Sequence, residues 1–253
     1  MAHGKRLLDG KTAFVTGGAR GLGEGIARAL IADGAKVAIA DLRPEVEATA
    51  KALSEVGGTC IGKVLDVRDL DSFERTFNDC AEKLGGIDIM VNNAARTVQC
   101  SLWDVTPQDW DDVQATNLRS AFFGTQIAAR HLRERTWGRI INLASIAGQI
   151  GGPVAGAHYA TSKAGILLMT RMWAVEMAPH GTTVNAIAPG AIDGPIMEIV
   201  PSERKAFLAE QTPVKRLGNM DEVGSVAAFL ASPNSGYITG ATIDINGGRY
   251  MRP

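Results

Sequence analysis

The strongest constraint on this chain is the alternation of short apolar runs with segments long enough to form helices. The runs are apolar at consecutive positions, which is typical of strands buried on both faces of a parallel sheet and joined by crossover helices. Seven such runs are countable: residues 13–16, 37–40, 61–65, 87–91, 139–143, 184–188 and 242–245. The sequence therefore predicts an α/β fold with a doubly wound, mainly parallel seven-stranded sheet.

One segment interrupts this alternation. Residues 189–218 contain three further prolines after Pro189 and a short helical stretch at 202–211. We predict that residues 190–217 form a lid over a substrate site. The remaining chain shows no composition shift, and its 253 residues can bury one core, so a single domain is expected over residues 1–253.

Composition disfavours several classes of partner. The net charge is −1 and the pI is about 6.4, so no basic surface for nucleic acid or anionic membranes is expected. The least polar long stretch, residues 140–157, is broken by polar residues and glycines, which disfavours a membrane-spanning helix. Three scattered cysteines without a C-x-x-C pair fit a reducing compartment, and no metal-binding spacing of His or Cys is present. We expect a cytoplasmic protein with a small-molecule substrate.

The first predicted strand runs into a glycine-rich turn. Residues 17–23 read Gly-Gly-Ala-Arg-Gly-Leu-Gly and precede a predicted helix at 22–32. Bare backbone and free helical N–H groups at such a turn can bind a pyrophosphate. The spacing is T-G-x-x-x-G-x-G, which differs from the G-x-G-x-x-G fingerprint, so its position in the first βα unit carries the argument.

Two carboxylates end the next two predicted strands. Asp41 lies 24 residues after Gly17, where a carboxylate would accept hydrogen bonds from the ribose hydroxyls and repel a 2′-phosphate. This favours NAD over NADP, although Arg20 and Arg43 are basic residues that could meet a phosphate. Asp66 follows the third strand and is placed to meet the adenine edge.

A tyrosine and a lysine four residues apart provide candidate proton-transfer chemistry. Helical spacing puts Tyr159 beside Lys163 on one helix face. A nearby cation favours the phenolate, so we expect the pKa of Tyr159 to be lowered from its usual value of about 10.

Several short motifs occur in a defined order. They are Thr16-Gly17-x-x-x-Gly21-x-Gly23, Asn92-Asn93-Ala94, Asn117, Ser145, Tyr159-x-x-x-Lys163 and Pro189-Gly190. With them the chain resembles the short-chain dehydrogenase/reductase family, of the NAD-dependent alcohol dehydrogenase type, over nearly its whole length. The resemblance implies a Rossmann fold and four catalytic residues. Tyr159 would be the general acid/base, Lys163 would lower its pKa and hold the nicotinamide ribose, Ser145 would bind the substrate oxygen, and Asn117 would anchor a relay water.

The motifs and the resemblance also define the candidate binding residues. Predicted cofactor contacts are Gly17, Arg20, Gly21, Leu22, Gly23, Asp41, Leu42, Asp66, Val67, Asn93, Ala94, Tyr159, Lys163, Pro189, Gly190 and Ile192. Predicted substrate contacts are Arg96, Ser145, Ala147, Tyr159, Ile196 and Met197. Arg96 could bind a polar substrate tail or be a solvated loop residue. The family often has a Thr where this chain has Asp193-Gly194, so the contact to the nicotinamide amide stays open.

Three functions are compatible with these residues. The leading hypothesis is hydride transfer between NAD(H) and a medium-sized, largely apolar secondary alcohol or ketone, of aryl, alicyclic or steroid-like shape. The alternative enzyme is a 3-oxoacyl-thioester reductase of fatty-acid type, for which Arg130, Arg133 and Arg135 could form a docking face. A non-catalytic NAD(H)-sensing protein is the third, and it has no physical need for Tyr159 beside Lys163. The family resemblance further implies a homotetramer, with the apolar helix after Tyr159 and residues 237–253 as candidate interfaces.

Overall fold

The predicted sheet is present. The computed structural model describes residues 6–151, 156–198 and 200–252, without the side chain of Ile196. Its strands are β1 (Thr12–Thr16), β2 (Lys36–Asp41), β3 (Cys60–Val64), β4 (Ile89–Asn92), β5 (Gly138–Leu143), β6 (Thr182–Pro189) and β7 (Thr242–Ile245). They form one sheet in the order β3-β2-β1-β4-β5-β6-β7, and every neighbouring pair is parallel. All seven predicted strands are therefore confirmed.

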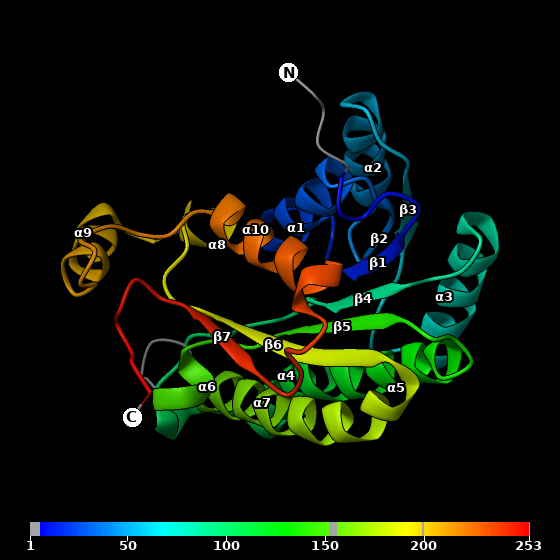
Figure 1. Ribbon diagram of the computed structural model, residues 1–253. Coiled ribbons are helices and arrows are strands. Elements are labelled where there is room, and N and C mark those ends of the chain that lie inside the picture. Colours follow the sequence, from blue (N-terminus) through cyan, green and yellow to red (C-terminus); the bar gives the residue numbers. More distant parts are fainter. Residues whose placement is uncertain (1–5, 152–155, 199, 253) are drawn as a thin grey trace.

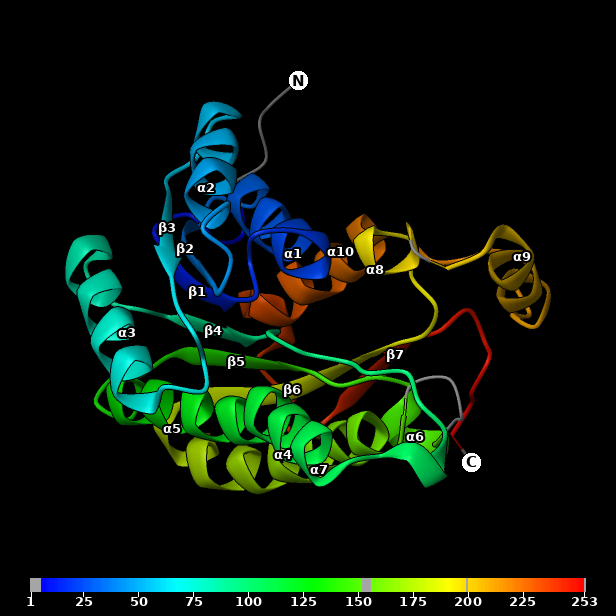
Figure 2. The ribbon, with the colours of Figure 1, turned by 180° about the vertical axis from the view of Figure 1, so that it is seen from behind.

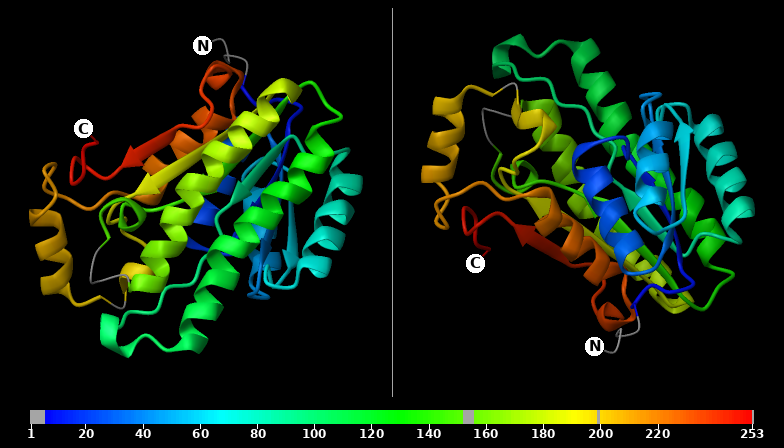
Figure 3. Two further views of the ribbon diagram at one scale, coloured as in Figure 1. Left: turned by 90° about the horizontal axis from the view of Figure 1, so that it is seen from below. Right: turned by 90° about the horizontal axis from the view of Figure 1, so that it is seen from above.

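Helices cover both faces of the sheet (Figure 1). The α-helices are α1 (Gly21–Ala32), α2 (Val46–Glu55), α3 (Leu70–Leu84), α4 (Pro107–Gln114), α5 (Ser120–Leu132), α6 (Ala147–Ile150), α7 (Ala157–Met177), α8 (Pro195–Glu198), α9 (Ser202–Glu210) and α10 (Met220–Ala231). The short turns are η1 (Leu102–Asp104), η2 (Ala115–Arg119), η3 (Ala178–His180) and η4 (Pro233–Ser235). Helices α1, α2 and α10 lie on one face, and α3, α5 and α7 lie on the other, as the views from below and above show (Figure 3).

The core has one apolar layer on each side of the sheet. On the α1 and α10 side, Val15, Ile26 and Leu230 are fully buried. On the α3, α5 and α7 side, Phe14 packs against Phe73 and Phe77, with ring centroids 6.1 and 5.5 Å apart. Consecutive residues of each central strand therefore enter opposite layers, which explains why the strands read as unbroken apolar runs.

The strand order reverses direction between β1 and β4. Ligands of doubly wound sheets bind at such a switch point, outside the carboxyl ends of the strands. The glycine-rich turn follows β1, Asp41 ends β2, and Ser145 lies two residues past β5. The topology thus brings the predicted cofactor and catalytic residues to one edge of the sheet.

Helices α8 and α9 stand beside this edge and project away from the sheet (Figure 1). The predicted helical stretch at 202–211 is present as α9. The base of the segment is fixed by a parallel bridge between Ile192 and Gly218 and by the bond from the Asp193 N–H to the Gly218 carbonyl, 2.8 Å. Its role as a lid stays a prediction. Among the described helices, none has the length and apolar character needed to cross a membrane.

Candidate active site

The turn after β1 is packed so closely that Gly17, Gly18 and Gly23 leave no room for a Cβ. Gly17 has φ +67°, and a Cβ there would lie 2.8 Å from the Asn93 Nδ2 atom. A Cβ on Gly23 would lie 2.0 Å from the Gly17 carbonyl oxygen. Asn93 Nδ2 donates to the carbonyl oxygens of Thr16 and Gly17, at 2.9 and 3.0 Å. Asn93 therefore holds the turn in shape.

The N-terminus of α1 opens from this turn. Arg20 is its N-cap in extended conformation, and no side chain caps the first N–H groups of the helix. Uncapped N–H groups and the positive end of the helix dipole favour an anion. The free N–H groups at the start of α1 therefore fit the pyrophosphate of a dinucleotide.

Asp41 lies beside the same turn. Its Oδ2 accepts a hydrogen bond from the Ala19 N–H at 3.1 Å, and its Oδ1 accepts one from the Arg43 N–H at 3.0 Å. These bonds fix a negative charge next to the phosphate turn, where it suits ribose hydroxyls better than a phosphate. The side chains of Arg20, Leu42 and Arg43 are exposed, with Leu42 61% accessible.

Asp66 is held by an arginine two residues away. Arg68 approaches its carboxylate with Nε at 3.0 Å and Nη2 at 2.7 Å, and the Arg68 N–H donates to Oδ1 at 2.9 Å. These bonds lower the pKa of Asp66. Val67 is buried beside it. The two residues predicted to contact the adenine are therefore one charged and one apolar residue.

Three of the four predicted catalytic residues, Ser145, Tyr159 and Lys163, meet at the carboxyl end of β5. The hydroxyl of Ser145 hydrogen-bonds to that of Tyr159 and also accepts from the Ala147 N–H at 3.1 Å. Lys163 is buried, and its Nζ donates to the Leu143 carbonyl at 2.6 Å while lying 5.5 Å from the centre of the Tyr159 ring. Helix α7 thus presents the phenol and the amine on one face, against the loop that carries Ser145.

The pKa of Tyr159 shifts in the direction opposite to the one expected from sequence. Its pKa is raised because loss of water around the phenol outweighs the hydrogen bond from Ser145. Burial lowers the pKa of Lys163 to about 7, so the amine is a weaker source of positive charge than expected. The predicted lowering of the Tyr159 pKa is therefore wrong for this structure, because desolvation acts against both charged forms.

The lowered pKa of Lys163 predicts a pH-dependent stability. Between pH 7 and the ordinary lysine value of about 10.4, the unfolded chain binds this proton and the folded chain does not. The free energy of unfolding should therefore rise with pH across that window. Urea denaturation at pH 7 and pH 9 checks this against Lys163→Met, in which the gain should shrink. Equal gains in both proteins would contradict it.

Asn117 lies in the π-helical turn η2, between α4 and α5. Its side chain is fully buried, with Oδ1 accepting from the Arg96 N–H at 2.7 Å and Nδ2 donating to the Arg96 carbonyl and the Ser162 Oγ, both at 3.0 Å. This turn interrupts the helical segment that begins at Pro107. Since both amide hydrogens are engaged, the side chain holds the loop at Arg96, and a relay water would have to use a remaining oxygen lone pair of this turn.

The predicted pocket residues lie around this edge on several elements. Ala147 and Met197 are buried, whereas Arg96 is exposed. The side chain of Ile196 lies outside the described part of the structure. Pro189 ends β6, Gly190 donates to the Ile245 carbonyl at 2.8 Å, and a Cβ on Gly21 would lie 3.7 Å from Pro195, so α8 begins above the phosphate turn.

Sequence reasoning missed the polar residues that support this site. The Thr16 Oγ1 accepts from the N–H groups of Asn93 and Ala94, at 3.0 and 3.1 Å. Between the sheet and its helices, Asn92 Nδ2 donates to Asn142 Oδ1 at 2.8 Å, and Asn142 in turn donates to Thr170 Oγ1 at 3.0 Å. Polar residues inside otherwise apolar strands were the available signal, because buried polar groups need partners.

Known proteins resemble this chain over nearly its full length. Residues 17–249 match the family model described as enoyl-(acyl carrier protein) reductase. The 3-oxoacyl-(acyl-carrier-protein) reductase FabG of Vibrio cholerae is 39% identical over 244 residues, which cover 96% of this chain and 99% of that protein.

Solved structures agree with the sequence comparison. A 3-oxoacyl-(acyl-carrier protein) reductase from Brucella melitensis superposes with a TM-score of 0.93 at 33% identity, covering 98% of this chain and 94% of that one. A short-chain type dehydrogenase/reductase from Mycobacterium marinum gives the same TM-score and identity, with 98% of both chains covered.

Fold, site and relatives together define a nicotinamide-dependent oxidoreductase built on a single doubly wound sheet. Two of these relatives are named as 3-oxoacyl-(acyl-carrier-protein) reductases. The chain belongs to the short-chain dehydrogenase/reductase family.

Proposed function

We propose that the protein reduces the 3-oxo group of an acyl thioester with NADH. The observation that carries the substrate class is the similarity to 3-oxoacyl reductases from Vibrio cholerae and Brucella melitensis. It favours the thioester alternative over the aryl, alicyclic or steroid-like alcohols of the leading sequence hypothesis. The carboxylate of Asp41 beside the phosphate turn supports NADH as the cofactor.

In this mechanism the chain supplies the proton and holds the substrate oxygen. Bound NADH would supply the hydride to the carbonyl carbon. Ser145 Oγ donates a hydrogen bond to the carbonyl oxygen, where negative charge develops during reduction. Tyr159 Oη, which shares a hydrogen bond with Ser145, gives its proton to that oxygen. A raised pKa keeps the phenol protonated and ready to act as an acid in this direction.

Lys163 has two roles in the proposal. Its Nζ is fixed by the Leu143 carbonyl and lies near the face of Tyr159, where a proton on the amine stabilises the phenolate left after transfer. Lys163 would also donate a hydrogen bond to a ribose hydroxyl of the bound cofactor. Asn117 acts beside them by holding the loop at Arg96, and the turn that carries it would hold a water that returns the proton.

A secondary alcohol dehydrogenase is the second candidate. Asp41 favours it, because its carboxylate suits NAD, the ordinary oxidant of alcohols. A 3-oxoacyl reductase of the fatty-acid type normally implies NADPH. A panel assay at 340 nm separates the two, with NADH or NADPH and 3-oxoacyl thioesters on one side, and NAD with aryl, alicyclic and steroid alcohols on the other. Thioester reduction with NADH supports the first proposal. Turnover of the alcohols alone would overturn it.

Asp41 is expected to set the choice of cofactor. In Asp41→Ala the carboxylate that repels a 2′-phosphate is gone, and the exposed Arg20 and Arg43 can approach that phosphate. The ratio of kcat/KM for NADPH to that for NADH should rise about 10-fold to 100-fold, as expected for about 1.4 to 3 kcal/mol. Steady-state kinetics with both cofactors measures this ratio.

Asp41→Asn is the matched control, because it keeps the shape and removes the charge. It should shift the ratio in the same direction as Asp41→Ala. A wild-type enzyme that already prefers NADPH would contradict the cofactor assignment.

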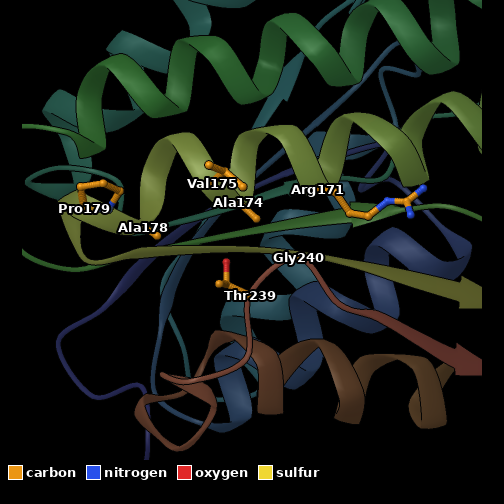
Figure 4. Close-up of a pocket in the computed structure, with 7 residues that line it drawn as sticks. All are labelled: Arg171, Ala174, Val175, Ala178, Pro179, Thr239 and Gly240. Atoms are coloured by element: carbon orange, nitrogen blue, oxygen red, sulfur yellow. The ribbon is translucent and has the colours of Figure 1, made fainter.

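We also propose that the protein assembles as a homotetramer through the outer face of α7. Leu168, Met172 and Val175 on this helix are exposed in the single chain, with accessibilities of 55, 63 and 78%. A surface hollow of about 480 Å³ lies at the far end of the same helix from Tyr159 and contains none of the predicted site residues (Figure 4). Its lining residues are Arg171, Ala174, Val175, Ala178, Pro179, Thr239 and Gly240.

A cytoplasmic location is proposed from the cysteines. All three are free, and burial raises the pKa of Cys60 to about 12 and that of Cys80 to about 11. Thiols with such values react poorly, which fits a compartment where no disulfide is required.

A further inference from the structure

The loop at Asp66, which is predicted to contact the adenine, is linked by a hydrogen bond and an ion pair to the helical segment that carries Asn117. The loop after β3 passes beside the rod formed by α4, η2 and α5 (Figure 2). Two arginines make the connection: Arg68 in this loop and Arg119 at the end of η2. They are 51 residues apart in the chain, so the contact is tertiary.

Arg68 uses its side chain in two directions. Its Nε and Nη2 hold the Asp66 carboxylate, and its Nη1 lies 3.6 Å from Asp112 Oδ1 on α4. The three side chains are only partly accessible, at 39, 31 and 27% for Arg68, Asp66 and Asp112. An arginine between two carboxylates, with its planar group fixed on one of them, forms a stiffer connection than a lysine could.

Arg119 adds a second bond to the same loop. Its Nη2 donates to the Arg68 carbonyl oxygen at 2.7 Å. Arg119 is the last residue of η2, and Asn117 lies two residues before it. Side-chain and main-chain bonds thus join the loop at Asp66 to both ends of the segment from Asp112 to Arg119.

The π-helical turn η2 is the part of this segment that these contacts hold in place. A π-helical turn lies outside the regular hydrogen-bond pattern of the helix and is common at functional sites. Thr116 Oγ1 bonds to the Asp112 carbonyl at 2.8 Å, so a shift at Asp112 reaches the turn directly. Three donors of Arg68 make four hydrogen bonds to the carboxylate of Asp66, so the position of the Asp66 side chain depends on Arg68.

We propose that Arg68 and Arg119 are positioning residues that tie Asp66 in the cofactor site to the turn that carries Asn117, so that filling the adenosine half of the site steadies the catalytic half. The proposal rests on the cofactor site of the proposed function. Ordering of the loop at Asp66 by a ligand would be passed to η2 through these bonds, as a loss of local motion.

Hydrogen–deuterium exchange with 5′-AMP as the probe tests this link without requiring turnover. In the wild type, saturating AMP should slow exchange of the amides at residues 115–120 about three-fold or more. In Arg119→Ala, calorimetry should give an AMP Kd within about two-fold of the wild type, but the slowing at 115–120 should be lost. In Arg68→Ala, AMP should bind more weakly, and the slowing should be reduced at saturation.

Arg75→Ala is the matched control. Arg75 is an exposed arginine on α3 whose side chain donates to Ser72, and its variant should behave like the wild type. Binding of AMP without slowing in the wild type, or equal slowing in Arg119→Ala, would overturn the link and leave the proposed cofactor site intact. Absence of AMP binding would instead refute the cofactor site, and the link with it.

Discussion

Tyr159→Phe is expected to lower kcat for ketone reduction about 1,000-fold. The substitution removes only the hydroxyl that hydrogen-bonds to Ser145, and with it the proton donor to the developing alkoxide. General acid catalysis typically contributes 10² to 10⁴-fold. Steady-state kinetics measures the loss, and the Kd for NADH should change less than about three-fold because the ring and its packing are kept.

Tyr237→Phe supplies the control for this variant. Tyr237 is fully exposed and far from the site along the chain, so loss of its hydroxyl should leave kcat unchanged. If Tyr159→Phe retained more than a tenth of wild-type turnover, another group would have to supply the proton and the mechanism would be wrong.

Ser145→Ala should have the second largest effect, a decrease in kcat of about 10² to 10³-fold. Loss of one preorganised donor to a developing oxyanion costs about this much in other enzymes. Ser145 also accepts a hydrogen bond from the Ala147 N–H at 3.1 Å. Ser145→Ala therefore also removes the acceptor of that N–H group.

Ser145→Thr separates these two contributions. It restores a hydroxyl at the same position, and it should recover at least a tenth of wild-type kcat if the donor is what matters. Equal activity of the Ser, Thr and Ala enzymes would show that the substrate oxygen is bound elsewhere.

The fold could be predicted from sequence because its central strands are buried on both faces. Largely apolar runs such as the one before Thr16 identified all seven strands, and the glycine-rich turn placed the first helix. Residues 189–218 broke the pattern, and they form α8, α9 and the irregular connections around them. Local composition decides these features, so sequence is enough for them.

The chemistry of the site depended on features that sequence does not carry. Spacing placed Tyr159 beside Lys163, but the direction of both pKa shifts follows from burial. The bonds from Asn117 to the loop at Arg96, and from Arg119 to Arg68, join residues 21 and 51 positions apart. Such contacts are set by tertiary packing, and no local sequence pattern predicts them.

Transfer of deuterium from NADH that carries deuterium at both hydrogen positions of the nicotinamide C4 tests the central claim most directly. The purified protein would be incubated with a 3-oxoacyl thioester and the labelled cofactor, and the product analysed by mass spectrometry. One deuterium at C3 of the 3-hydroxyacyl product, formed about 1,000-fold more slowly with Tyr159→Phe, is the result that this account predicts. A 3-hydroxyacyl product without deuterium, or labelled product at the wild-type rate from the Phe variant, would contradict it.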